Sequence, residues 1–239
     1  MQGDQPDFSS SEPVVPAGSP LWPRHLIDLF IAPGRFFSSQ LALGKRPYLL
    51  PVIYLFGIAA TLDRLELRVH QSLLRITLGS TPPVWKFLEP LATNWLYFWG
   101  YGLFTGLVSA VLIWWIGGWW FRVRTRWSGA VNPDTRKARL VYVYAATVWT
   151  IPYLAHLAGG SLVYDSYVTW WEGGTSWDLL LLVFPFWSAV AGYKGVISVF
   201  EVSRRRAMVW FLLLPSLLYL TTFGALVALH LLGPPPGPG

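Results

Sequence analysis

The feature that most constrains the fold is a set of long apolar blocks. Residues 91–116, LATNWLYFWGYGLFTGLVSAVLIWWI, contain no charged side chain. Three further blocks carry one ionisable residue each: 140–158 contains His156, 179–200 contains Lys194 and 207–232 contains His230. A helix needs about 20 apolar residues to cross roughly 30 Å of hydrocarbon. These blocks therefore predict membrane-spanning helices.

A fifth block, residues 47–62, is shorter. It can cross if it continues into the next residues, where apolar side chains recur at helical spacing: Leu62, Leu65, Val69, Leu73 and Ile76. Polar residues fill the other positions: Asp63, Arg64, Glu66, Arg68 and Gln71. The first span is thus expected to run on into an amphipathic helix at the far surface. The alternative is a re-entrant or interfacial first segment, which leaves four spans and puts both termini on one side.

The predicted fold class is an all-α polytopic membrane protein: a bundle of five transmembrane helices preceded by a short interfacial amphipathic helix. The predicted organisation has these parts: a disordered cytosolic tail at 1–22, a membrane domain at 23–232 with an interfacial helix at 24–41 and spans at about 47–66, 91–116, 139–158, 179–200 and 207–232, and a disordered Pro/Gly tail at 233–239. Residues 1–22 lack the basic start and apolar core of a cleaved signal peptide.

Composition agrees with a membrane protein, because 54% of the residues are hydrophobic and only 13% are charged, against roughly 25% charged in soluble domains. The absence of cysteine excludes disulfides, thiol catalysis, iron–sulfur clusters and cysteine-based zinc sites. The net charge is +6. Because the arginines stand in short segments between apolar blocks, they indicate topology signals and contacts to anionic membrane lipids rather than nucleic-acid binding.

Lysine and arginine counts in short loops predict the orientation. Most basic residues fall before the first span, between the second and third, or around the fourth-to-fifth connection. Residues 159–178 contain none, and carry Asp165, Glu172 and Asp178. The N-terminus is therefore expected inside and the C-terminus outside. This acidic, tryptophan-containing loop is read either as an ordinary outer loop or as a site for a cation or sugar.

The segment HLIDLFIAPGRFF, residues 25–37, is apolar but too interrupted to span. On a helical wheel, a broad apolar face lies opposite Arg24 and Asp28, as in an interfacial helix. It is formed by Leu26, Ile27, Leu29, Phe30 and Ile31. Pro33 breaks the helix. A second element starting at Arg35-Phe36-Phe37 is expected to hold its rings in the lipid and its cation at the headgroups. The segment either only positions the first span, or presents Asp28 and Arg35 to a partner or closes the inner mouth of the bundle.

Several motifs in order resemble one known family. They are DLFIAPGRFF ahead of the first span, Gly117-Gly118 after the second, Tyr142-Val-Tyr144-Ala145-Ala146 followed by Ile151-Pro152-Tyr153, and Lys194-Gly195 leading through Ser203 to Arg206-Ala207. This pattern, over about residues 24–232, resembles the Yip-type membrane domain, the family of Rab/Ypt-interacting proteins and their bacterial relatives.

The resemblance implies five spans, a cytosolic N-terminus and a non-catalytic scaffold or adaptor. Eukaryotic members work with small GTPases in vesicle traffic. The tail at 1–22 is far shorter than the regions with which those members engage partners. That length argues against a GTPase partner and favours a prokaryotic relative in the cell (inner) membrane.

The sequence contains no set of residues that predicts catalysis, a metal site or a cofactor site, and no motif of that kind. The candidate contacts to a protein partner or lipid are Asp28, Pro33, Arg35, Phe36, Phe37, Arg122, Arg124, Arg126, Lys194, Arg204, Arg205 and Arg206. The arginines at 122, 124 and 126 would point one way if extended. Small residues predict close helix packing, within the chain or in a homo-oligomer, at Gly102, Gly106, Ser188 and Gly192.

The alternative function is a transporter or a subunit of a transport complex. Lys194 is the main candidate for it, because ionisable residues in hydrocarbon are costly. Its long stem can also snorkel to the headgroups. Five spans do not divide into equal halves, and the sequence shows no internal repeat of the kind found in many transporters.

Overall fold

The computed structural model describes residues 24–41, 46, 48–173, 181, 183–221 and 224. All regular structure in these residues is helical, which confirms the all-α class. The predicted tails at 1–22 and 233–239 lie outside the described residues, and so do Asp178 and His230.

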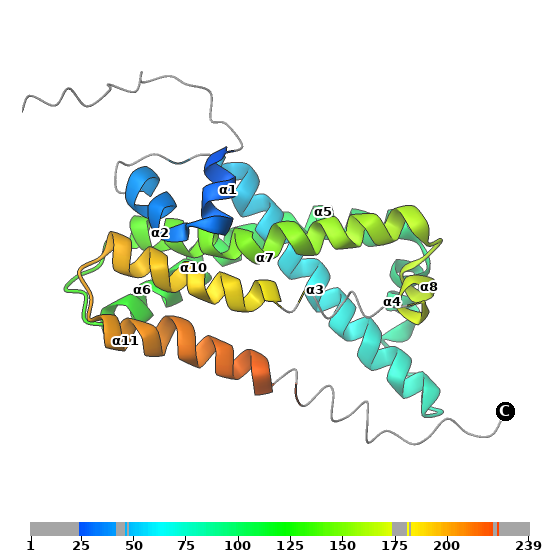
Figure 1. The fold of residues 1–239 in the computed structure, drawn as a ribbon. Helices are drawn as coiled ribbons and strands as arrows, with labels where there is room; N and C mark the ends of the chain where they lie inside the picture. Colours follow the sequence, from blue (N-terminus) through cyan, green and yellow to red (C-terminus); the bar gives the residue numbers. More distant parts are fainter. Residues whose placement is uncertain are drawn as a thin grey trace, which may run out of the picture.

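The chain follows a simple up-and-down course (Figure 1). Its helices are α1 (Arg24–Ile31), α2 (Pro33–Phe36) with a π-helical turn η1 (Phe37–Leu41), α3 (Leu49–Thr77), α4 (Trp85–Thr93), α5 (Trp95–Leu112) continuing through η2 (Ile113–Gly117) into α6 (Gly118–Trp127), α7 (Thr135–Val163), α8 (Tyr167–Glu172), α10 (Val183–Val199), and α11 (Arg204–Met208) continuing through η3 (Val209–Leu213) into helical residues 214–221.

Local capping explains where several helices start. The Asn94 side chain accepts a hydrogen bond from the Leu96 N–H at 2.8 Å at the start of α5. Asp134 accepts from the Arg136 N–H at 2.6 Å and the Lys137 N–H at 3.2 Å at the start of α7. These side chains satisfy donors that have no partner inside the helix.

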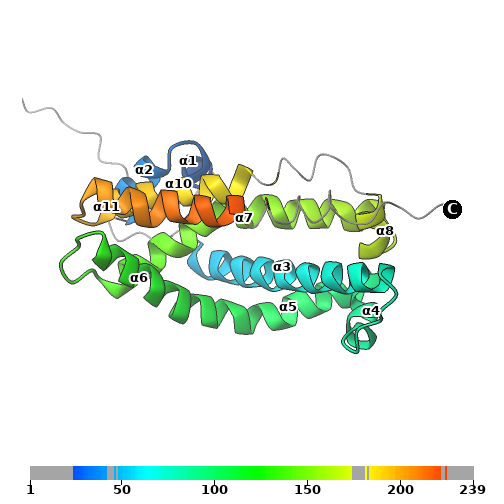
Figure 2. The ribbon, with the colours of Figure 1, turned by 90° about the horizontal axis from the view of Figure 1, so that it is seen from below.

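The long helices form one bundle (Figure 2). The continuous α5–α6 helix, α7, α10 and α11 run side by side, and α3 crosses them at a tilt (Figure 1). The α6–α7 and α10–α11 connections lie at one end, which we call the basic end; α4 and α8 lie at the opposite end. One core cluster surrounds α7 toward the basic end, and a second joins α3, α4, α5, α7 and α8 toward the opposite end.

Small residues allow α3 and α5 to pack closely against each other. A Cβ added at Gly57 would clash with the Gly106 carbonyl oxygen, and one at Gly106 would come within 2.8 Å of Ile58 Cγ1. One at Gly102 would lie 2.6 Å from Leu62 Cδ2. In the pair α7–α10, Ser188 Oγ donates to the Ala145 carbonyl oxygen at 3.0 Å, and a Cβ at Gly192 would be 3.8 Å from Ala145 Cβ. Gly102, Gly106, Ser188 and Gly192 therefore all face neighbouring helices of their own chain.

Two helices in the described part of the chain are long and apolar enough to cross a membrane: Trp95–Trp127 and Thr135–Val163. The first continues well beyond the predicted end of the second span at residue 116. α3 is one continuous helix, and Leu62, Leu65 and Val69 on its apolar stripe are buried.

Candidate functional site

The candidate site is the N-terminal cap, residues 24–41, which packs on α7 and α10. α1 stops at Ile31, and the Ala32 N–H donates to the Asp28 carbonyl oxygen at 2.8 Å. Trp187 of α10 donates its Nε1–H to the Phe30 carbonyl oxygen at 2.6 Å. Pro33, which is buried, starts α2, where its missing N–H has no consequence. The helix break is thus held by a hydrogen bond from the bundle.

Phe36 and Phe37 attach the cap to the bundle. Both rings are buried, at 1% and 0% exposure. Phe36 packs edge-on against Tyr144 of α7 with ring centres 5.3 Å apart. Phe37 lies over Gly195 of α10, where an added Cβ would be 2.9 Å from Phe37 Cε2. The expectation that these rings enter lipid was wrong, because the missing side chain at Gly195 makes room for one of them inside the protein.

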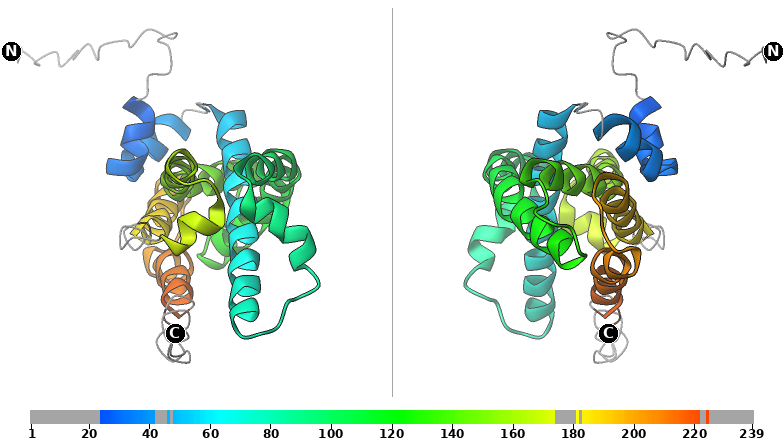
Figure 3. Two further views of the ribbon diagram at one scale, coloured as in Figure 1. Left: turned by 90° about the vertical axis from the view of Figure 1, so that its right-hand side faces the viewer. Right: turned by 90° about the vertical axis from the view of Figure 1, so that its left-hand side faces the viewer.

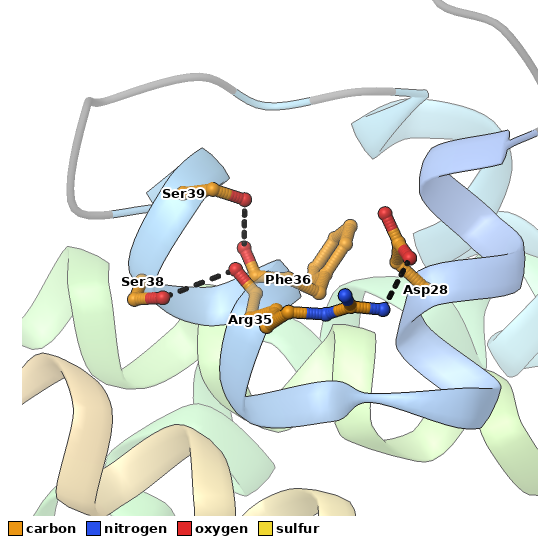
Figure 4. Close-up of polar contacts among 5 residues, drawn as sticks. All are labelled: Asp28, Arg35, Phe36, Ser38 and Ser39. Carbon is orange, nitrogen blue, oxygen red and sulfur yellow. Dashed lines mark hydrogen bonds and ion pairs between the residues drawn. The ribbon is translucent and has the colours of Figure 1, made fainter.

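Asp28 and Arg35 form an ion pair on the exposed side of the cap (Figure 4). Arg35 Nη2 lies 3.4 Å from Asp28 Oδ1, and their side chains are 74% and 35% exposed. Ser38 Oγ donates to the Arg35 carbonyl oxygen at 3.1 Å. An exposed pair of this kind contributes at most about 1 kcal/mol to stability. Its importance lies in the charge pattern that it presents.

Arg122, Arg124 and Arg126 do not point one way. They belong to α6, and successive residues of a helix are rotated by roughly 100°. Arg122 donates its Nε–H to the Pro133 carbonyl oxygen at 2.9 Å, and Arg126 is exposed. The common direction expected for an extended segment therefore does not arise, because this segment is helical up to Trp127.

Arg124 is turned into the contact between α6 and the last helix. Its guanidinium carbon lies 4.8 Å from the centre of the Phe211 ring and 5.4 Å from that of Phe121. Its Nη1 donates to the Trp210 carbonyl oxygen at 3.4 Å. Within the described residues Arg124 Nε has no hydrogen-bond partner. Aromatic rings, rather than a carboxylate, thus stabilise the positive charge of Arg124. Arg124 therefore contributes more to helix packing than to the charge of the surface.

The other predicted cations lie on the surface of the basic end. Lys194 is exposed on α10 toward this end. Arg204, Arg205 and Arg206 are exposed in the first turn of α11. Cations at a helix N-terminus oppose the helix dipole, so the fold of α11 gives no reason for them. The connection itself is fixed by the Ser203 N–H, which donates to the Ser128 carbonyl oxygen at 3.0 Å.

A polar cluster at the opposite end was missed from the sequence. Tyr153 Oη donates to Glu66 Oε2 at 2.7 Å, and a hydrogen bond of 2.8 Å joins His70 Nε2 to Tyr167 Oη. The His70 ring lies 3.7 Å from that of Trp171, centre to centre. Periodicity placed Glu66 on a polar helix face, but it carries no signal for a tyrosine 87 residues later in the chain.

The predicted acidic loop is partly described. Asp165 and Glu172 are exposed, and Trp170 packs against the rings of Trp95 and His156. Within the described residues no three His, Asp or Glu side chains are placed to hold a metal ion.

Comparison with known proteins adds no family to this geometry. No protein-family model, no curated protein and no solved structure matches the chain.

Proposed function

We propose that this chain is a multi-pass membrane protein of the Yip-like type that acts as a non-catalytic scaffold, with the cap as its partner-docking surface. The membrane location is supported by apolar side chains on the outside of the bundle. Phe104 is 82% exposed, Leu107 61% and Leu217 60%. Large apolar side chains exposed in this way are typical of a surface that contacts membrane lipid or another protein.

In this proposal five helices cross: α3, α5–α6, α7, α10 and the helix that starts with α11. α3 has 29 residues, a length of about 43 Å, which exceeds the roughly 30 Å of hydrocarbon. Its residues 49–66 cross, and the remainder, which contains His70, extends beyond the hydrocarbon at the far surface. The basic end faces the cytoplasm by the positive-inside rule. The proposed location is a prokaryotic inner membrane, with the N-terminus inside and the C-terminus outside.

The observation that carries the scaffold function is the anchoring of the cap by Phe36 and Phe37. A segment that only led into the first span would need no aromatic anchor inside the bundle. The anchor fixes the Asp28–Arg35 pair at one place on the cap (Figure 4). At the same end, Arg126 and Arg204 to Arg206 are exposed. Their positive charge attracts anionic lipid or an acidic surface of the partner.

The test exchanges the two charges. The double variant Asp28→Arg, Arg35→Glu keeps an ion pair but reverses the pattern shown to a partner. We expect in-cell crosslinking, followed by affinity purification and quantitative mass spectrometry, to lose the specific partner by about tenfold, the effect of roughly 1.4 kcal/mol. The control reverses exposed charges at the opposite end, with Lys86→Glu and Glu172→Arg. Equal capture by both double variants would contradict the docking role.

One observation favours the transport alternative. Glu66, hydrogen-bonded to Tyr153 between α3 and α7, is an ionisable group inside the bundle, and such groups mark ion pathways in membranes. Lys194 gives no such support because it is exposed. Proteoliposomes carrying a pH-sensitive dye decide the point: proton flux that Glu66→Gln abolishes establishes transport, and no flux above that of empty vesicles contradicts proton transport.

A further inference from the structure

A groove lies between the cap and the start of α3. α1 and α3 stand apart on α7, which forms the floor between them (Figure 3). The cavity has a volume of about 330 Å³. Its walls include Leu26 of α1 with Val52 and Leu55 of α3, and Thr147 and Thr150 of α7 form the floor. The size is that of a small-molecule site, and the walls are apolar.

On the floor of the groove, the Thr150 hydroxyl has no acceptor among the residues that the structure describes. Thr147 donates its hydroxyl to the Val143 carbonyl oxygen at 3.0 Å, the usual arrangement for threonine inside a helix. Thr150 is only 1% exposed, and among the residues that the structure describes its Oγ1 has no hydrogen-bond partner. Buried hydroxyl groups are nearly always paired. An unpaired one that lines a cavity points to a ligand with an acceptor atom.

The entrance combines a cation with a lipid-facing side. Tyr48, which also lines the groove, directly precedes α3 and is 41% exposed. Arg46, two residues earlier, is exposed and lies within electrostatic range of Tyr144 of α7. Leu50, beside the groove, is 79% exposed. An occupant therefore has an exposed cation two residues before the Tyr48 wall, a hydroxyl on the floor and apolar walls next to the strongly exposed Leu50.

We propose that this groove binds one anionic phospholipid. An acyl chain lies between α1 and α3, an ester carbonyl accepts the Thr150 hydroxyl, and the phosphate lies at Arg46. The inference rests on the membrane location given under the proposed function. It goes beyond that function by making a specific lipid part of the contact between the cap and the bundle. A peptide segment fits the site less well, because it would bring unpaired backbone groups into a groove with apolar walls.

The experiment uses the full chain, purified in mild detergent, exchanged into mixed micelles with equal amounts of palmitoyl-oleoyl phosphatidylglycerol and phosphatidylcholine, and examined by native mass spectrometry. We expect the wild-type chain to retain one phosphatidylglycerol, at least fivefold in preference to phosphatidylcholine. Leu55→Trp fills the groove and should lower retention about tenfold. Thr150→Val removes the hydroxyl at nearly constant shape and should lower it about threefold. Arg46→Gln should abolish the preference for the anionic lipid.

Matched controls exclude general lipid adhesion. Leu107→Trp adds the same side chain to a shallow lipid-facing depression formed with Tyr54, Gly100, Leu103 and Phe104. Lys137→Gln removes an exposed cation elsewhere at the basic end. Both should retain lipid as the wild type does. The inference is overturned if Leu55→Trp retains lipid normally, if Leu107→Trp loses as much, or if the retained mass is a free fatty acid or detergent.

Carbonate extraction of the source membranes separates failure of this inference from failure of the proposed function. A chain that carbonate releases is not membrane-embedded, and both proposals then fail. A chain that stays in the membrane but shows no groove-dependent retention leaves the scaffold proposal standing and refutes the lipid site alone.

Discussion

At the scale of single residues, His70 shows what burial does to an ionisable group. Its ring lies between Tyr167 and Trp171 of α8, and burial lowers its pKa to about 4. A neutral imidazole hydrogen-bonds the tyrosine without the cost of burying a charge. His70 therefore joins α3 to α8 in its uncharged form.

This pKa predicts a pH-dependent attachment of α8. When α8 opens, His70 meets water and its pKa returns to about 6.5. Between pH 6.5 and the closed-state pKa of about 4, the open state binds more protons, so the closed state loses stability as the pH falls through this window. The full loss is at most about 3.5 kcal/mol, from roughly 1.4 kcal/mol for each pH unit of difference.

Amide hydrogen exchange in α8, measured from pH 7 to pH 4 and corrected for intrinsic exchange rates, gives this dependence directly. The His70→Gln variant should lose it. A His156→Gln variant changes a different ring contact to α8, that with Trp170, and leaves the His70–Tyr167 hydrogen bond in place, so it should keep the dependence. Protection in the wild type that does not change with pH would refute the assignment.

At the scale of helices, the contact between α3 and α5 depends on missing side chains. Gly106 faces Ile58 so closely that a Cβ would lie 2.8 Å from Cγ1 and 2.9 Å from Cα. The second of these atoms is backbone and cannot move aside without shifting the helix. Gly100 on the same helix has nothing within 4 Å of an added Cβ.

Gly106→Ala and Gly100→Ala therefore form a matched pair with the same change in helix propensity. We expect Gly106→Ala to destabilise the bundle by about 1–3 kcal/mol through overpacking. Gly100→Ala should be neutral or slightly stabilising, because alanine is the better helix former. Unfolding in mixed micelles, followed by tryptophan fluorescence, measures the difference. Equal stability of the two variants would show that α3 and α5 can separate freely at this point.

Some features of the N-terminal cap could be predicted from the sequence, and others could not. Helix periodicity placed Leu29 on an apolar face and Pro33 at a break, and the structure has Leu29 buried and α2 starting at Pro33. These features depend on neighbours along the chain. The burial of Phe37 depends on the gap at Gly195, far away in sequence. A pattern within one segment cannot contain that information.

The same limit applies to the candidate site. The arginines of α6 were predicted as a basic group, but their directions depend on whether the second helix ends before them or continues to Trp127. The helix continues through these charged residues because the guanidinium of Arg124 packs against the Phe211 ring of another helix. Likewise, the groove at Thr150 exists only because α1 and α3 both pack on α7. Composition and periodicity predict long apolar helices, whereas the sites between these helices arise from tertiary packing.

At the scale of the whole molecule, the proposed number of membrane crossings and the proposed orientation can be tested together. Both depend on the side of the membrane on which the cap, the basic end and the opposite end lie. The chain contains no cysteine, so single cysteines can be introduced without background. Three exposed positions suffice: Ser38 in the cap, Glu201 at the basic end and Glu172 at the opposite end. A maleimide that cannot cross membranes then reports the side of each position in intact cells.

Five crossings with the basic end inside predict that Glu172→Cys reacts in intact cells, while Ser38→Cys and Glu201→Cys react only after permeabilisation. If the first segment were re-entrant, the positive-inside rule would still hold Glu201 inside, but the cap would join the opposite side and Ser38→Cys would react with intact cells. Labelling of Ser38 thus decides between four and five crossings. Labelling of Ser38 also tests the position of the cap. The cap packs on α7 and α10 beside Tyr144 and Gly195, so it must lie on the same side of the membrane as the basic end.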